Sequence, residues 1–290
     1  MKIAYILYKV QEKYLHGVAN DEDKELLDFL KTKGLDIYPE IWNDEKVNWE
    51  QYSVALLKSP WDYFENIQHF YVWLSNLDKM GIRLLNPTSL VKWNSDKHYL
   101  KDIEQKGLNV IPSLFLEKGS VFENNTLFFN SLKSEKIVLK PCVSAGAKNT
   151  LVLTQNNLAS EINKINLLLK EESYLIQPYE KEILKGEWSF LFFNQKYSHS
   201  ILKTPKQGDF RVQHYLGGSI HYQQAKELYV NMANEYIQAF AKNSLYARVD
   251  GIIKDEQFHL MELELIEPYL FLNYHPKTFE NYYQALVELL

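Results

Sequence analysis

Two runs of alternating residues between positions 246 and 266, separated by a short polar segment, constrain the fold more than any other feature of this sequence. Successive side chains of a β-strand point to opposite faces, so each run predicts a strand with one charged face. The first charged face carries Arg248 and Asp250, and the second carries Glu262 and Glu264. The polar segment has a suitable length for a hairpin loop. The pattern therefore predicts an antiparallel hairpin with acids on both strands.

The register of this hairpin decides whether its acids meet. A five-residue loop around 254–257 places Asp250 opposite Glu262, on one face with Glu264. A regular four-residue loop places Asp250 opposite Met261 instead, with both glutamates on the other face. We assume the first register, or a β-bulge that gives the same result. The first register, reached with or without a bulge, brings three carboxylates together.

Three carboxylates on adjoining strands repel one another unless a cation lies between them. Hard cations such as Mg²⁺ take oxygen ligands, commonly one or two carboxylates together with the phosphates of a nucleotide. The set Asp250, Glu262 and Glu264 therefore predicts a Mg²⁺–ATP site. The alternative is a solvent-exposed strand face with alternating charge, since short motifs often match by chance.

Bulk properties narrow the class of protein. A length of 290 residues allows one large domain or two to three small ones, and 46% hydrophobic residues are ordinary for a globular chain. The net charge of −5 gives no indication of nucleic-acid or anionic-membrane binding. The single cysteine, Cys142, excludes an internal disulfide and fits a reducing compartment. The apolar run after Met1 is too short for a membrane span, so we expect a cytoplasmic protein.

The first 90 residues alternate between strand-like and helix-like patterns, which predicts a small open sheet with helices on its faces. Expected strands lie at 2–8, 35–42, 53–58 and 83–85, and expected helices at 21–33 and 65–80. The segment Ser59-Pro60-Trp61-Asp62-Tyr63 directly follows one of these strands. Ligands of open α/β sheets bind at the carboxyl ends of strands, so Asp62 between two aromatics could hold a polar organic substrate. Alternatively, Trp61 and Tyr63 pack a turn and Asp62 caps the next helix.

Four cations are further candidates. Lys97 lies in an expected helix at 88–106, and Lys140 ends an expected strand at 137–141. The small-residue loop after Lys140 could bring backbone N–H groups close to phosphates. Lys203 and Arg211, which bracket a further segment, could clamp phosphates. Each of these cations, judged alone, could equally be a solvated surface residue. Further helices are expected at 225–245 and 278–290.

Taken together, these motifs resemble the ATP-grasp superfamily, in particular its glutathione-synthetase-like branch and the cyclo-ligases that close the ring of cycloserine from O-ureido-serine. The matching motifs keep their order over most of the chain: SPWDY (59–63), SDKHYL (95–100), VLKP (138–141), IQPY (176–179), GEWS (186–189), SHSILKTP (198–205), GDFRVQ with GG (208–218), RVDG (248–251) and MELELIEP (261–268). One departure is Glu262-x-Glu264, where many members have Glu-x-Asn.

The resemblance implies an α/β fold with α+β lobes, divided into an N-terminal α/β domain (1–92), a central lid (93–178) and a C-terminal lobe (179–290), with ATP between the last two. It also implies roles for single residues. The nucleotide contacts would be Lys97, Lys140, Ser144, Glu187 and the hinge Gln177-Pro178-Tyr179, whose backbone would read adenine. Lys203 and Arg211 would face the transferred phosphate, Asp250, Glu262 and Glu264 would hold Mg²⁺, and Trp61, Asp62, Tyr63 and Arg248 would contact the second substrate.

The activity implied is that of an ATP-dependent ligase. A substrate carboxylate would attack the γ-phosphate, and an amine or similar nitrogen would capture the acyl phosphate, with release of ADP and phosphate. Capture within one molecule would make the enzyme a cyclo-ligase, and capture between molecules an amide ligase. Its partners would be small-molecule carboxylates and amines, with no nucleic acid and no membrane. The alternatives are an ATP-grasp kinase that phosphorylates a small molecule and a nucleotide-binding protein without turnover.

Overall fold

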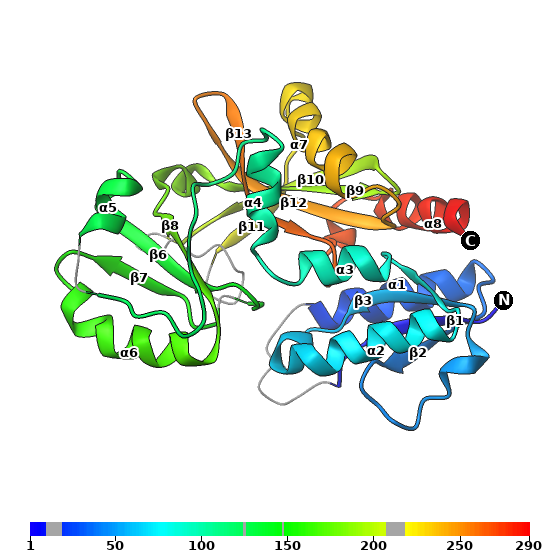
Figure 1. The fold of residues 1–290 in the computed structure, drawn as a ribbon. Coiled ribbons are helices and arrows are strands. Elements are labelled where there is room, and N and C mark those ends of the chain that lie inside the picture. Colours follow the sequence, from blue (N-terminus) through cyan, green and yellow to red (C-terminus); the bar gives the residue numbers. More distant parts are fainter. Residues whose placement is uncertain (10–18, 124–125, 147, 207–217) are drawn as a thin grey trace. The chain divides into compact units, whose positions relative to one another are not determined.

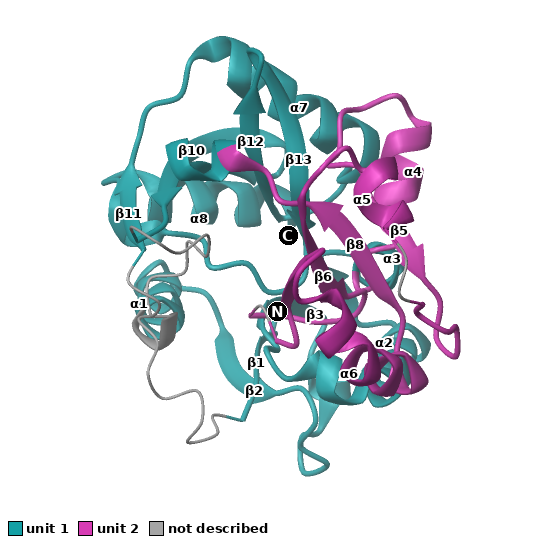
Figure 2. Ribbon diagram, turned by 90° about the vertical axis from the view of Figure 1, so that its left-hand side faces the viewer, with its two compact units in different colours: residues 1–94, 182–290 teal, residues 95–181 magenta. Residues whose placement is uncertain are grey.

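The structure is a computed structural model that describes residues 1–9, 19–123, 126–146, 148–206 and 218–290. The chain divides into two compact units, shown in different colours in Figure 2. The first unit combines residues 1–94 with residues 182–290, and the second comprises residues 95–181. Within the described ranges, no helix is long and apolar enough to cross a membrane.

A parallel four-stranded sheet forms the N-terminal part of the first unit. In the order β2-β1-β3-β4, it comprises β2 (Ile37–Ile41), β1 (Ile3–Leu7), β3 (Val54–Ser59) and β4 (Arg83–Leu85). Helix α1 (Ala19–Thr32) packs on one face of the sheet and α2 (Ile67–Lys79) on the other. Because both faces are covered, β1 and β3 are buried along almost their whole length, which explains their continuous apolar sequence. The predicted open α/β sheet is confirmed.

An antiparallel five-stranded sheet forms the C-terminal part of the same unit (Figure 1). In spatial order its strands are β11 (Ser219–Tyr222), β10 (Lys196–Thr204), β9 (Glu187–Phe193), β12 (Tyr246–Lys254) and β13 (Gln257–Glu264). Helix α7 (Glu227–Phe240) packs on one face, where Tyr236 meets Phe258. Helix α8 (Thr278–Leu289) covers part of the other face, where Tyr282 meets Phe193. Further along β9, that second face carries polar residues instead.

The hairpin of β12 and β13 has a two-residue turn and a β-bulge. Asp255 and Glu256 both have positive φ, 50° and 59°, as a type I′ turn requires. Pairing is regular from the turn to Gly251, which faces Leu260, and then shifts so that Asp250 faces Glu262. The loop is therefore shorter than the lengths considered from the sequence, and the bulge supplies the predicted pairing of the two acids.

Glycine is required beside this bulge. A Cβ atom at position 251 would lie 2.2 Å from the carbonyl oxygen of His259 and 2.5 Å from the ring of Phe258. Those distances are far below normal contact, so any other residue would push β13 away from β12. Asp250 thus supplies the acid, and Gly251 allows the close approach of β13, the strand that carries Glu262 and Glu264.

An antiparallel four-stranded sheet forms the second unit. In spatial order it comprises β5 (Leu114–Leu116), β8 (Tyr174–Pro178), β6 (Lys136–Pro141) and β7 (Leu151–Thr154). One face is apolar and packs against α5 (Leu127–Ser131) and α6 (Leu158–Glu171), through residues such as Phe129 and Ile165. The other face is more polar. The remaining elements are α3 (Thr88–Asn94) in the first unit, α4 (Tyr99–Gln105) in the second, and short 3₁₀ turns at Trp49–Gln51, Tyr63–Asn66, Lys181–Lys185 and Leu272–Tyr274.

The single helix expected at 88–106 is wrong, because the chain breaks between α3 and α4. The side chain of Asp96 accepts the backbone N–H of His98 at 3.0 Å, which favours a turn over a helix. The backbone N–H of Lys97 donates to the carbonyl of Cys142 at 2.9 Å, so this segment is hydrogen-bonded to the loop after β6. The break places Lys97 in a turn instead of on a helix face.

Buried polar groups fix the backbone at 269–272, directly after the C-terminal hairpin. The carboxylate of Glu22 accepts the N–H of Leu270 at 2.9 Å and that of Leu272 at 3.0 Å. Lys58 neutralises this carboxylate, with its Nζ 3.2 Å from Glu22 and 2.8 Å from Asp23. The Nε2 atom of His199 lies 2.9 Å from the carbonyl oxygen of Leu270, so it carries the proton.

Acid should destabilise the fold through His199. Burial lowers the pKa of His199 to about 4, from an ordinary value of 6.5. Between these pH values the unfolded chain binds a proton that the folded chain does not, so the free energy of unfolding falls as the pH falls. The contribution is about 3 kcal/mol, fully present above pH ~6.5 and lost by pH ~4. Urea unfolding across this range should show the loss in the wild type and a smaller one in His199→Gln. His69→Gln, at an exposed histidine, should behave like the wild type.

Candidate active site

Asp250 is the centre of a polar cluster on the face of the five-stranded sheet that α8 leaves uncovered. Residues paired across neighbouring antiparallel strands share a face, and Asp250 pairs with Glu262 on one side and with Ser189 on the other. Arg248 Nε lies 3.1 and 3.0 Å from the two oxygens of Asp250, and Ser189 Oγ donates to Oδ1 at 2.6 Å. Asp250 is 4% exposed. Its carboxylate is therefore held rigidly and kept charged.

Lys203 joins two buried acids. Its Nζ donates to Glu187 and lies 3.3 Å from Asp250 Oδ2. Burial would raise the pKa of Asp250, but Arg248 and Lys203 outweigh it and hold that pKa below its ordinary value. Burial also raises the pKa of Glu187, against the opposing charge of Lys203. The two acids thus differ in character, since Asp250 is the one whose environment favours the charged form.

Glu264 is the acid whose charge the cations of the cluster balance poorly. Burial raises the pKa of its carboxyl to about 8, helped by Asp250 and Glu262 and opposed by Arg248, which contacts it. The side chain keeps 23% exposure, so solvent reaches this edge of the cluster. Among the candidate residues of this face, the four acids outnumber the two cations, Lys203 and Arg248. A donor set of carboxylate oxygens with unbalanced charge fits a hard divalent cation, with Asp250, Glu262 and Glu264 as its ligands.

Two of the nucleotide candidates share one face of the second unit's sheet. Val138 pairs with Gln177, and Lys140 pairs with Leu175, so Lys140 and Gln177 point to the same side, opposite to the apolar core. Gln177 Nε2 donates to Ser113 Oγ at 2.9 Å. Pro178 has no N–H to offer, and the N–H of Tyr179 already donates to the carbonyl of Lys136 at 2.8 Å. The ring of Tyr179 lies 4.1 Å from the Lys136 ammonium.

The loop after β6 is held by Lys97, the other candidate lysine in this unit. Lys97 Nζ donates to the carbonyl oxygen of Ser144 at 3.0 Å and lies 3.3 Å from Ser144 Oγ. Ser144 Oγ itself donates to the carbonyl of Pro141 at 3.2 Å. The structure therefore brings Lys97 and Ser144 together at the start of the small-residue loop.

The substrate candidates at 61–63 lie in the first unit. Asp62 Oδ1 accepts from Trp42 Nε1 at 2.6 Å, and burial raises the pKa of its carboxyl. Trp61 Nε1 donates to the carbonyl of Glu267 at 3.0 Å, which joins this segment to the chain just beyond Glu264. Within the described part of the chain, Asp62 makes no capping hydrogen bond, and Asn66 caps α2 instead. The helix-cap alternative for Asp62 is therefore wrong.

One candidate, Arg211, lies outside the described residues. The others form three groups. Glu187, Lys203, Arg248, Asp250, Glu262 and Glu264 share one sheet face; Trp61, Asp62 and Tyr63 follow β3; and Lys97, Lys140, Ser144, Gln177, Pro178 and Tyr179 belong to the second unit.

Sequence reasoning missed the residues that support these groups. Ser189 lies in one of the quoted motifs but had no assigned role. Asn86 donates to the carbonyls of Tyr246 and Leu265 at 2.9 and 2.8 Å, and Asn94 donates to that of Leu263 at 2.7 Å. These asparagines fix β12 and β13 in place. Their partners lie more than a hundred residues away, so local pattern gave no signal.

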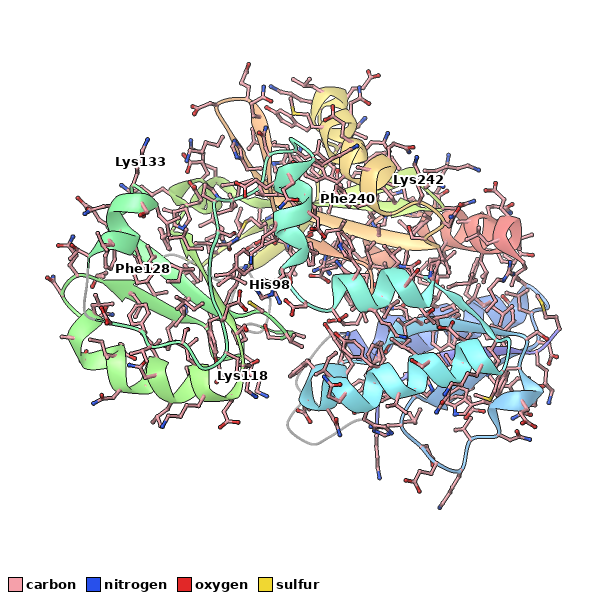
Figure 3. All side chains as sticks on the ribbon, in the orientation of Figure 1. His98, Lys118, Phe128, Lys133, Phe240 and Lys242 are labelled. Atoms are coloured by element: carbon pink, nitrogen blue, oxygen red, sulfur yellow. The ribbon has the colours of Figure 1, made fainter. Side chains whose placement is uncertain are left out.

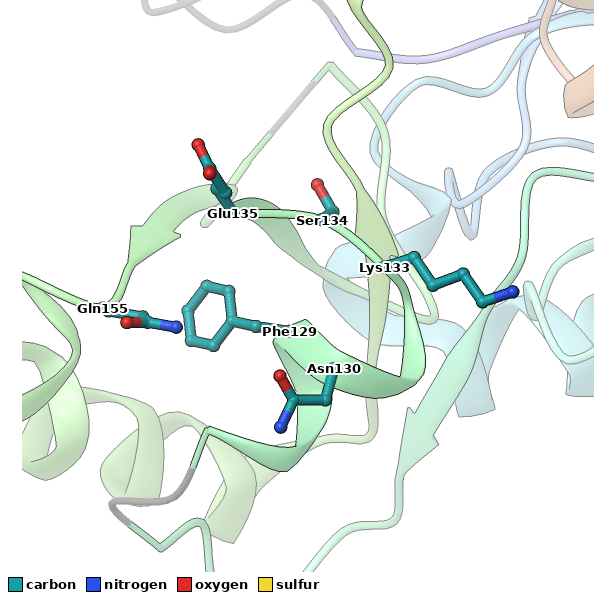
Figure 4. A pocket seen from close by; sticks show the side chains of 6 residues that line it. All are labelled: Phe129, Asn130, Lys133, Ser134, Glu135 and Gln155. Atoms are coloured by element: carbon teal, nitrogen blue, oxygen red, sulfur yellow. The ribbon is translucent and has the colours of Figure 1, made fainter.

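A shallow hollow on the second unit is not the candidate site. It has a volume of about 320 Å³ and lies between α5 and the ends of β6 and β7 (Figure 4). Its lining consists of Phe129, Asn130, Lys133, Ser134, Glu135 and Gln155, and no candidate residue is among them. The candidate residues are therefore defined by their contacts and not by this hollow.

The fold and the similarity to known proteins identify the chain as an ATP-grasp ligase, an ATP-dependent enzyme that forms carbon–nitrogen bonds. The chain belongs to the family described as "Prokaryotic glutathione synthetase, ATP-grasp domain", whose model matches residues 120–269. A second model, "D-cycloserine synthetase DcsG, N-terminal domain", matches residues 3–86. The predicted resemblance, fold class and enzyme class are confirmed.

Similar proteins include one relative and several solved structures. The chain is 27% identical to the cycloserine biosynthesis protein DcsG of Streptomyces lavendulae, over 91% of this chain and 92% of that protein. The crystal structure of D-cycloserine synthetase DcsG has a TM-score of 0.84 at 23% identity, covering 99% of each chain. A D-alanine–D-alanine ligase from Bacillus anthracis has a TM-score of 0.75 at 18% identity, covering 100% of this chain and 97% of that one.

Proposed function

We propose that this ligase closes a ring in an O-substituted amino acid such as O-ureido-serine. ATP phosphorylates the substrate carboxylate, and a nitrogen of the same molecule displaces the phosphate, with release of ADP and phosphate. The similarity to D-cycloserine synthetase supports the substrate class, because it extends over nearly the whole chain. The observation that carries the chemistry is the buried cluster in which Lys203 and Arg248 both contact Asp250.

We further propose that Asp250, Glu262 and Glu264 hold Mg²⁺, which would neutralise phosphate charge when bound. Lys203 holds Asp250 in place and stabilises charge on the transferred phosphate, together with Arg211. Arg248 uses its fork of donors on Asp250 and Glu264 and on the carbonyl of Tyr269 at 3.0 Å. When Asp250 and Glu264 bind the cation instead, the Arg248 donors that contact these acids become available to bind the substrate carboxylate.

The remaining roles are also proposals. Lys97, Lys140 and Ser144 contact ATP phosphates, Glu187 lies toward the nucleotide, and Gln177 to Tyr179 contact adenine. The division into segments 1–92, 93–178 and 179–290, and a cytoplasmic location, are proposed on the resemblance to the family.

A screen for ADP release tests the function. The purified chain, ATP and Mg²⁺ would be incubated with amino acids and their O-substituted derivatives, and products identified by mass spectrometry. We expect ADP only with particular O-substituted amino acids, and a cyclised product without phosphate. A stable phosphorylated product would identify a kinase instead, and binding of ATP without ADP release on any substrate would identify a binding protein.

Lys140→Ala should weaken ATP binding about tenfold or more, because one positive charge near the phosphates is lost. The fold should survive, since Lys140 is only half-buried and lies on the face opposite to the core. Calorimetry with a non-hydrolysable ATP analogue measures the change. Lys170→Ala, at an exposed lysine of the same unit, is the matched control. Equal affinities in the two variants would remove Lys140 from the nucleotide site.

Asp62→Asn should raise the KM for the amino-acid substrate about tenfold or more and leave the KM for ATP unchanged. An asparagine can still accept the Trp42 N–H bond, but it lacks the charge that would attract a substrate ammonium group. Steady-state kinetics with each substrate varied in turn separates the two constants. Glu65→Gln, at an exposed acid three residues further on, is the control. A raised KM for ATP with an unchanged substrate KM would place Asp62 elsewhere.

A further inference from the structure

A second group of metal-binding side chains lies in the second unit, apart from the acidic cluster. The ligand atoms of Asp96, His98 and Cys142 all lie within 4.8 Å of one another. Asp96 and His98 come from the turn between α3 and α4, and Cys142 directly follows β6. His98, labelled in Figure 3, precedes α4. The set contains one thiol, one imidazole and one carboxylate.

We propose that Asp96, His98 and Cys142 bind a thiophilic divalent cation of the Zn²⁺ class. Thiolate, imidazole and carboxylate are the ligands of tetrahedral zinc, and a hard cation such as Mg²⁺ would not choose a thiolate. Tetrahedral bond lengths require ligand atoms roughly 3.3–3.8 Å apart. The three side chains therefore need only small movements to reach this geometry, with a solvent molecule in the fourth position.

The histidine is oriented for this role by a second carboxylate. Its Nδ1 lies 2.6 Å from Asp96 Oδ1, whereas its Nε2 lies 3.3 Å from Glu117 Oε1. The imidazole also stacks on the Phe115 ring, with centroids 4.5 Å apart. A metal-binding histidine commonly donates its other ring N–H to a carboxylate, which fixes the ring and its tautomer. Glu117 provides that partner.

The accessibility and charge of the group also suit a cation. The side chains of Asp96 and His98 are 41% and 27% exposed, so a cation can enter from solvent, while Cys142 is buried behind them. Two acids and a thiolate face two lysines, Lys97 and Lys101. With the thiol proton released to solvent on binding, the group is left with a net negative charge that a divalent cation compensates.

Metal binding would clamp the turn that carries Lys97 to the loop after β6. The two segments are already joined by the hydrogen bond from the Lys97 N–H to the Cys142 carbonyl. The proposed ion adds a side-chain link between the same two segments and leaves the Lys97 ammonium on Ser144.

Titration with Co²⁺ tests the proposal, because a cobalt–thiolate bond absorbs in the near ultraviolet. Cys142 is the single cysteine of the chain, so this band reports on this site alone, even if Co²⁺ also binds the acidic cluster. We expect a saturable band in the wild type that Zn²⁺ removes by displacement. His98→Gln should lose it, and His69→Gln should keep it. Absence of the band in the wild type, or a band unchanged in His98→Gln, would overturn the proposal.

Glu117→Gln provides a second test in case the His98 variant fails to fold. Glu117 is 64% exposed on its side chain, so the variant should fold normally. Loss of such a supporting carboxylate typically weakens metal affinity 10- to 100-fold, and we expect a shift of that size with the band retained. Cys142→Ser sets the spectral baseline. An affinity for Co²⁺ equal to that of the wild type would contradict the arrangement around His98.

Discussion

Asp250→Asn is expected to lower turnover at least ~10³-fold, about 4 kcal/mol of barrier. Asp250 is a proposed metal ligand, and Ser189, Lys203 and Arg248 all reach its carboxylate. An asparagine keeps the shape but removes the charge that opposes two buried cations and would bind Mg²⁺. Coupled ADP release at saturating ATP and Mg²⁺ measures the effect, and a melting curve checks that the variant is folded.

Two variants of the same hairpin calibrate this result. Glu262→Gln should lower turnover less, about 10²-fold, because Glu262 is half-buried on the edge strand and water can replace part of its contribution. Glu256→Gln, at the tip of the turn, should leave turnover unchanged. Turnover of Asp250→Asn within tenfold of the wild type would show that the cluster does not hold the catalytic metal.

Lys203→Met is expected to lower the free energy of unfolding by about 3–5 kcal/mol, the usual cost of leaving a buried charge without its partner. The lysine is 7% exposed and contacts Glu187 and Asp250, which are also buried. Asp250 would keep its ion pair with Arg248. Most of the lost stability should therefore come from Glu187, which would lose its ion pair with Lys203. Equilibrium unfolding in urea at neutral pH measures the difference.

The reason for the loss can be checked with a double variant. Replacing Glu187 as well, in Lys203→Met with Glu187→Leu, removes the unpaired acid and should recover most of the stability. Lys196→Met breaks an ion pair with Glu288 whose side chains are 69% and 44% exposed, and it should cost no more than ~1 kcal/mol. A loss equally small in Lys203→Met would mean that water screens the cluster far better than its burial indicates.

The parts of the fold that sequence predicted are those with a strong local period. Both runs of the C-terminal hairpin were predicted from their alternation. The alternation also assigned Arg248 and Asp250 to one face, because a period of two fixes the side of the sheet regardless of what lies around it. The polar contacts of this face follow from that placement.

Some of the parts that escaped prediction depend on non-local contacts or are short elements. Lys58 pairs with Glu22, 36 residues earlier in the chain. The local sequence around either residue gives no indication of the other. The elements β5 and α5, of three and five residues, are too short to show a period. The turn at Asp255 and Glu256 was missed because neither residue is glycine, although both adopt the left-handed conformation.

The position of the β-bulge makes the hairpin tip a separate region for protein engineering. Four regular residue pairs, from Gly251–Leu260 to Lys254–Gln257, lie between the bulge and the turn. The pairing that aligns Asp250 with Glu262 is set on the other side of the bulge, where Gly251 allows close approach. A peptide tag or a dye-binding sequence inserted between Asp255 and Glu256 would therefore leave the acids aligned. Deletion of Met261, the residue without a partner in this pairing, would remove the bulge and still leave Glu262 opposite Asp250.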